Sequence, residues 1–138
     1  MTNNEILVAE YNPNPICKDP HYSGDCMIRA ICMVTGHEWV DVYNRLCKRG
    51  LEMGSMPNGI HVVAKEFEDE LQLIDYKNAN QSAREFILTH QIGSYIINIK
   101  RHAFALVNGI AYDAEADTLM KDVGNRKVFS YFITKPKE

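Results

Sequence analysis

The sequence has little that would attract a polyanion or insert into a membrane. Its 138 residues carry a formal charge of −3, and no basic cluster is longer than Lys100-Arg101 or the pair Lys135 and Lys137, which disfavours nucleic acid as a partner. It has no apolar run long enough to span a bilayer, and its first residues lack the basic start, apolar core and cleavage site of a signal peptide. We therefore expect a cytoplasmic protein that binds neither nucleic acid nor membrane.

The sequence also lacks the cysteine patterns of a disulfide framework or a zinc site. Its four cysteines include no CxxC pair, and no second cluster would complete a tetrahedron around Cys17, His21, Cys26 and His37. Without secretory features, the cysteines are expected to be reduced thiols. No glycine-flanked serine elbow surrounds Ser23, which disfavours a serine hydrolase. We predict no metal and no other cofactor.

The first half of the chain has helical patterns. A run of ten residues, CMIRAICMVT (26–35), is apolar on nearly every side, as in a central buried helix, and Gly36 ends it. From 38 to 49, apolar residues recur at steps of three and four, and Gly50 closes the pattern. These patterns predict two successive helices, the first of them buried.

Two shorter helices follow. The segment 51–58 is expected to be a connector, with Asn58 as the cap of a third helix. Ser82, with Glu85 three residues later, is a capping-box signature for a brief helix that ends near His90.

The second half of the chain changes to strand patterns. Turn residues separate the β-branched and aromatic runs, and Asn108-Gly109 is a strong signal for a two-residue hairpin turn. The predicted strands are GSYIINIK, HAFALVN, IAYDA and KVFSYFIT. Helices followed by strands predict one α+β domain over 1–138, in which the helix that bears Cys26 packs on a C-terminal antiparallel sheet.

Cys26 opens the first helix, directly after Gly24 and Asp25. A free cysteine is most often a small buried apolar residue, and Cys32 and Cys47 fit that description. The first turn of a helix is different, because its unpaired backbone N–H groups and positive dipole end favour the thiolate form and can bind a developing oxyanion. Position therefore makes Cys26 a candidate nucleophile.

His102 begins the strand HAFALVN. A structural, half-buried histidine is the alternative to a general base at this position. The turn at Asn108-Gly109 returns the chain antiparallel, so that Asp113 can reach the imidazole. Asp117 would take that place if a bulge shifted the register, and either acid could instead be exposed in a loop, DAEAD.

The pieces SGDCMIRAICMVTG, PNGI and KRHAFALVNGIAYD, in this order, resemble small bacterial and phage-type members of the papain-like cysteine peptidase superfamily, including the domains that process bacteriocin leader sequences. The resemblance implies a catalytic triad of Cys26, His102 and Asp113. Members commonly place a glutamine before the cysteine as an oxyanion donor, whereas this chain has KDPHYSGD. His21, Tyr22 or a backbone N–H would have to substitute for it.

The resemblance implies cleavage of a peptide or isopeptide bond through an acyl-enzyme, with the lead-in 11–25 and the connector 51–58 bordering the cleft. Deamidation and transpeptidation use the same three residues. A second hypothesis is an inactive papain-like module that holds a peptide or protein partner in the same cleft. In a third, Cys26 is only buried packing in a structural protein.

Overall fold

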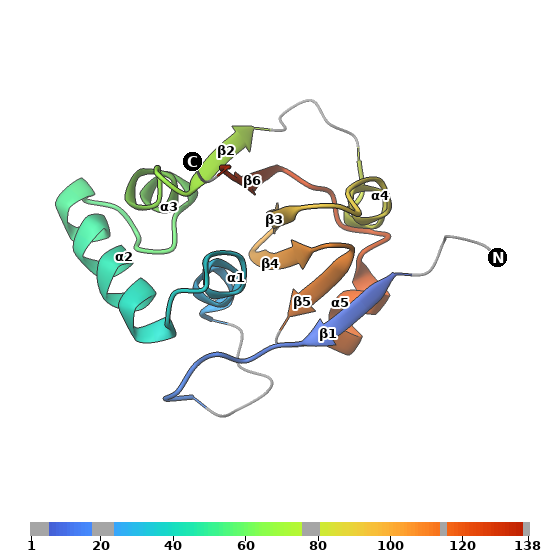
Figure 1. Ribbon diagram of the computed structural model, residues 1–138, viewed down its shortest axis with the longest axis horizontal. Helices are drawn as coiled ribbons and strands as arrows, with labels where there is room; N and C mark the ends of the chain where they lie inside the picture. The colour runs from blue at the N-terminus through green and yellow to red at the C-terminus, as the bar shows by residue number, and fades with distance from the viewer. Residues whose placement is uncertain (1–5, 18–23, 76–80, 114–115, 137–138) are drawn as a thin grey trace.

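The computed structural model describes residues 6–17, 24–75, 81–113 and 116–136. It has an α+β fold, with N-terminal helices followed by a six-stranded mixed sheet that is mostly antiparallel (Figure 1). The helices are α1 (Cys26–Thr35), α2 (Trp39–Met53), α3 (Ile60–Glu66), α4 (Ala83–Thr89) and α5 (Ala116–Asp122). The strands are β1 (Leu7–Glu10), β2 (Leu71–Asp75), β3 (Ser94–Ile99), β4 (His102–Val107), β5 (Ile110–Asp113) and β6 (Ser130–Thr134). No helix within the described ranges is long and apolar enough to cross a membrane.

Helix α1 is the central helix that its composition predicts. It begins at Cys26 and ends at Gly36, whose φ of 82° is left-handed and whose N–H donates to the Cys32 carbonyl. Figure 1 shows α1 between the α2–α3 pair and the sheet, and it packs chiefly against β4. Cys26, the first residue of α1, therefore lies close to the sheet.

The strands lie in the order β1-β5-β4-β3-β6-β2. The predicted hairpin between β4 and β5 is confirmed, and both turn residues, Asn108 at φ 47° and Gly109 at φ 84°, have the positive φ that a type I′ turn requires. The expected sheet was antiparallel and C-terminal, which is wrong at one edge, where an N-terminal strand adds in parallel. Strand β1 pairs in parallel with β5, and β2 pairs antiparallel with β6.

The two faces of the sheet carry separate apolar clusters. Ala103 and Ala105 of β4 belong to the cluster formed with α1, α2 and α3. Phe104 and Leu106 belong to the cluster formed with α4 and α5. Small residues face α1 because a helix packs closely there, while the larger ones fill the opposite side.

Two predicted helix boundaries are wrong. Gly50 does not end α2, which continues to Met53 and ends at Gly54 with a left-handed φ of 64°. Gly50 is a glycine for another reason, because a Cβ there would lie 2.9 Å from the Ser55 carbonyl oxygen. The cap of α3 is Gly59 and not Asn58, and it makes no side-chain capping bond. The boundary predicted for α4 is confirmed, since the side chain of Ser82 accepts from the Glu85 N–H.

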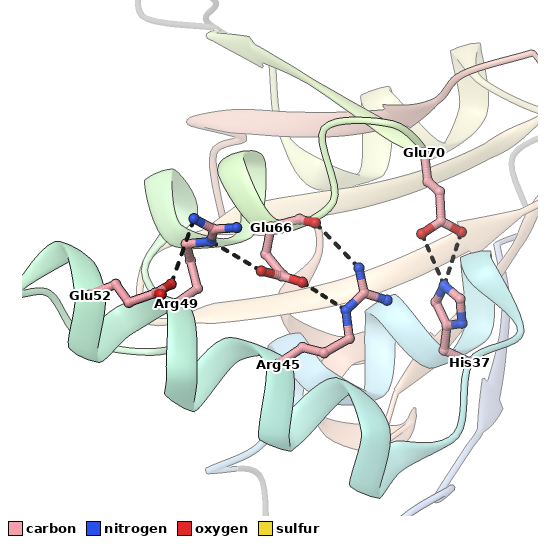
Figure 2. Close-up of polar contacts among 6 residues, drawn as sticks. All are labelled: His37, Arg45, Arg49, Glu52, Glu66 and Glu70. Atoms are coloured by element: carbon pink, nitrogen blue, oxygen red, sulfur yellow. Dashed lines mark hydrogen bonds and ion pairs between the residues drawn. The ribbon is translucent and has the colours of Figure 1, made fainter.

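Charged side chains join α2 to α3 (Figure 2). The Glu66 carboxylate accepts from Arg45 Nε at 2.7 Å and from Arg49 Nε at 3.0 Å. Partial burial would raise the pKa of Glu66, but the hydrogen bonds from the two arginines outweigh it and lower that pKa. Nearby, His37 Nε2 lies 2.9 Å from Glu70. These contacts fix the two helices on either side of the short connector that leads toward the site.

Candidate active site

Cys26 and His102 line the same open cavity, of about 250 Å³, where the start of α1 meets the end of the sheet. Cys26 is the first residue of α1, and His102 is the first residue of β4, where it pairs with Ile99 of β3. A two-residue turn, Lys100-Arg101, joins these strands. The fold thus brings together a thiol and an imidazole that lie far apart in the sequence. A larger hollow of about 600 Å³, next to Glu70, has neither cysteine nor histidine in its described lining.

The other side of the His102 ring contacts an acid. Nε2 of His102 lies 2.9 Å from Oδ2 of Asp113, the last residue of β5, and Asp113 is only 7% exposed. The Asp113 backbone is itself anchored, because its carbonyl accepts from the Tyr11 N–H at 2.9 Å, just beyond the pairing of β1 with β5. The pairing of β5 with β1 and the bond from Tyr11 therefore hold the acid against the imidazole.

Burial alone would lower the pKa of His102, but other contacts raise it to about 10. The causes are the hydrogen bonds of the imidazole to Asp113 and to Cys26, together with the charges of these two groups. Because Nε2 is engaged by Asp113, Nδ1 is the ring nitrogen that remains for the Cys26 sulfur. The imidazolium form thus lies between two groups that can each carry a negative charge.

Asp25, the N-cap residue of α1, uses its side chain for contacts other than capping. Asp25 makes no side-chain capping bond. Its carboxylate is buried and instead accepts from Asn14 Nδ2 at 2.9 Å, from Arg29 Nε at 2.8 Å and from Trp39 Nε1 at 2.8 Å. Among the described residues, no partner accepts the backbone N–H of Cys26. This first-turn N–H and the helix dipole can therefore stabilise an oxyanion beside the sulfur.

Sequence reasoning missed the part that Asp25 plays. Its spacing from Arg29, four residues along the same helix, is typical of an ion pair and could have indicated one. The contacts to Asn14 and Trp39 had no such signal, because they join residues from the lead-in loop and from the next helix.

Asn98 is a second residue that sequence reasoning missed. It lies in β3, lines the cavity with Cys26 and is 7% exposed. Its Nδ2 donates to Ser130 Oγ at 2.9 Å. The only signal was a polar residue within the apolar run YIINIK.

The remaining thiols lie elsewhere. Cys32 is buried in α1, where burial first and the charge of Asp25 second raise its pKa to about 12. Cys47 is partly buried in α2. Cys17 is partly exposed in the lead-in, where its N–H donates to Asn14 Oδ1.

Some of the predicted residues cannot be assigned a place. His21 and Tyr22, the side chains considered as oxyanion donors, lie outside the described residues, as does Ser23. Asp117, the alternative acid, belongs to α5, but its side chain lies outside the described part. Across the described ranges, His, Cys, Asp and Glu side chains do not gather in threes as metal ligands would.

Comparisons with protein-family models, with curated proteins and with solved structures gave no match.

Proposed function

We propose that this chain is a papain-like cysteine peptidase or a related thiol acyltransferase, with one domain over 1–138 and Cys26, His102 and Asp113 as its triad. One observation carries the proposal. The imidazole of His102 interacts with the thiol at the start of a helix and with a buried carboxylate 2.9 Å away, and the thiol and imidazole line one open cavity. This is the relation among nucleophile, base and orienting acid that thiol acyl transfer requires.

The first half-reaction starts with the transfer of the Cys26 thiol proton to His102. The thiolate then attacks the carbonyl carbon of the substrate amide and forms a C–S bond, while the negative charge moves to the carbonyl oxygen near the first N–H of α1. When the tetrahedral intermediate collapses, the C–N bond breaks and the leaving amine takes a proton from His102. The product is a thioester on Cys26, and Asp113 orients the imidazole throughout.

The second half-reaction releases the acyl group. Water gives a proton to His102 and attacks the thioester carbonyl, after which the C–S bond breaks and the proton returns to the sulfur. Hydrolysis of a peptide or isopeptide bond leaves a carboxylic acid and the free thiol. An amine in place of water gives transpeptidation, and a side-chain amide as substrate gives deamidation.

The fold supports the papain-like assignment through the order of its parts. A cysteine begins a central helix, a histidine begins a strand packed against it, and an aspartate ends the next strand. The glutamine expected from the resemblance is absent upstream of Cys26. We propose that a backbone N–H in the first turn of α1, which the Asp25 side chain does not cap, takes the place of this glutamine.

A binding module is the second candidate, favoured by the same missing glutamine. In that case the cavity holds a peptide or protein partner without cutting it, and Cys26 forms no thioester. Replacement of Cys26 by alanine would then leave partner binding intact.

Selective alkylation tests the proposal. With iodoacetamide at low excess near neutral pH, Cys26 should react at least about tenfold faster than Cys17, because Cys26 interacts with the His102 imidazole. Peptide mapping by mass spectrometry gives the rate at each cysteine, and Cys26→Ser is the control that should lose the fast phase. Labelling of Cys17 at the same rate would contradict an activated thiol. An electrophilic peptide aldehyde that binds without a covalent adduct to Cys26 would favour the binding module.

A further inference from the structure

Asn98 forms part of the floor of the cavity beside Cys26. It lies in β3, where it pairs with Ala103 of β4 on one side and with Ser130 of β6 on the other. Ala103 belongs to the cluster on the α1 face of the sheet, and residues paired across strands point to the same face. Asn98 therefore projects toward the helix that bears the sulfur.

The Asn98 amide is only half satisfied. Its Nδ2 donates to Ser130 Oγ at 2.9 Å, which leaves Oδ1 as the free atom of the amide. Oδ1 is buried and has no hydrogen-bond partner among the described residues. Buried polar atoms without a partner are costly and uncommon, so a group that binds next to Asn98 gains by donating a hydrogen bond.

The other residues of the cavity narrow the chemistry of that group. The described lining contains no Asp or Glu, and its positive groups, Arg101 and the His102 imidazolium, outnumber the Cys26 sulfur, so a cationic side chain would meet net repulsion. A carboxylate would face the Asn98 oxygen, which can only accept. An aliphatic side chain would pack against Met27 and Ile60 but would leave the amide oxygen unpaired.

A neutral carboxamide satisfies these conditions. Its NH₂ group can donate to Asn98 Oδ1, and its carbonyl can accept from the rim, where Arg101 and Asn58 carry N–H donors. Arg101 has a left-handed φ of 60° in the turn between β3 and β4, which is unusual for a residue other than glycine. This backbone conformation sets the direction in which its side chain begins.

We propose that Asn98 determines specificity, and that the cavity takes a glutamine or asparagine side chain next to the bond that Cys26 attacks. This inference builds on the proposed function, since it names the substrate class of the same site. The carboxamide binds as a recognition group, and the attacked carbonyl is the neighbouring backbone one.

The test is a cleavage profile. The full chain is incubated with a peptide library digested from an unrelated proteome, and the cleaved bonds are read by mass spectrometry. At one of the two positions that flank the cut, Gln and Asn together should be enriched at least about tenfold over Glu, Asp and Leu. Asn98→Leu, which has similar volume, should lose this enrichment. Ser130→Ala should reduce it less, since the Asn98 amide itself remains.

Two measurements separate the possible failures. Iodoacetamide labelling of Cys26 should stay as fast in Asn98→Leu as in the wild type, which shows that the variant is folded and its thiol still activated. If it does not, Asn98→Ala, which removes the accepting amide oxygen without adding bulk, replaces it and should also lose the carboxamide preference. Cleavage without that preference, or with the same preference in the variants, overturns the inference alone. Slow labelling of Cys26 and no cleavage in the wild type overturn the proposed function as well.

Discussion

Helix α1 carries two thiols with opposite surroundings. Cys26, in its first turn, borders an open cavity and interacts with the imidazole of His102. Cys32, further along, is 4% exposed among apolar residues, and its pKa is raised to about 12 by burial and then by Asp25. The two share a helix and a chemical type, so the difference shows that position in the fold decides what a cysteine can do.

Asp25, the residue before Cys26, affects the surroundings of both thiols. Its backbone carbonyl accepts the first helical bond, from the Arg29 N–H, while its carboxylate is held inward by Trp39 and Asn14. The inward position keeps a negative charge off the helix start, where it would oppose a thiolate. The same position brings that charge toward Cys32.

Replacing the His102 imidazole should have the largest effect on the difference in reactivity between Cys26 and Cys32. In His102→Ala, Cys26 loses its proton acceptor, so its reaction with an electrophilic peptide should slow by about 10²-fold or more. Stopped-flow or mass-spectrometric rates measure this. His61, which is exposed on α3, offers the matched control, since His61→Ala should react as the wild type does. An unchanged rate in His102→Ala would mean that the imidazole does not activate the thiol.

Removing the hydrogen bond from Trp39 to Asp25 should have the next largest effect. Trp39→Phe keeps an aromatic ring beside Tyr43 but removes the indole N–H that donates to the buried carboxylate. The free energy of unfolding should fall by about 1.5–3 kcal/mol, as is usual for a hydrogen bond to a charged group. Urea denaturation measures it. Tyr43→Phe is the control, because it keeps the stacked ring and should cost far less; equal losses would contradict the role given to the indole.

The ion pair of His102 predicts a pH dependence. The pKa of His102 is raised from 6.5 to about 10. The resulting stabilisation is complete at pH values below 6.5 and is lost as the pH rises through about 10. Between pH 7 and the raised pKa, the wild type should lose at least about 1.4 kcal/mol, the equivalent of one pKa unit. Asp113→Asn removes the negative partner, so its loss over that interval should be smaller. Parallel urea titrations at both ends of the interval compare them, and identical slopes would argue against the pairing.

Cys32 should give the smallest effect. Cys32→Ala removes one buried sulfur, so stability should fall by about 1 kcal/mol while the labelling rate of Cys26 stays the same. In the wild type, iodoacetamide should reach Cys32 only after urea unfolds the chain. Reaction of Cys32 in the native protein would remove the contrast between the two thiols.

Features with local signals were predictable from the sequence. The bounds of α1 follow from its apolar run and from Gly36, and the β4–β5 turn follows from Asn108-Gly109. The turn alone suffices to bring the acid Asp113 near His102, since turn type fixes the register of a hairpin.

Features that depend on distant contacts were not predictable. β1 forms only by adding to β5 from the far end of the chain, and its four residues, LVAE, have no strand periodicity of their own. Helix α2 runs through Gly50 because tertiary packing against the following loop overrides the usual stop signal. The short α5, for which no helix was predicted, packs against β1 and β5 in the same non-local way.

The parallel pairing of β1 with β5 also has a consequence for biosynthesis. The ribosome synthesises the N-terminal part first, so Cys26 emerges long before His102. Strand β1 likewise emerges before β5, the strand with which it pairs. A nascent chain therefore carries an ordinary thiol. The thiol and the imidazole can therefore meet only once the β4–β5 hairpin has been translated and docked.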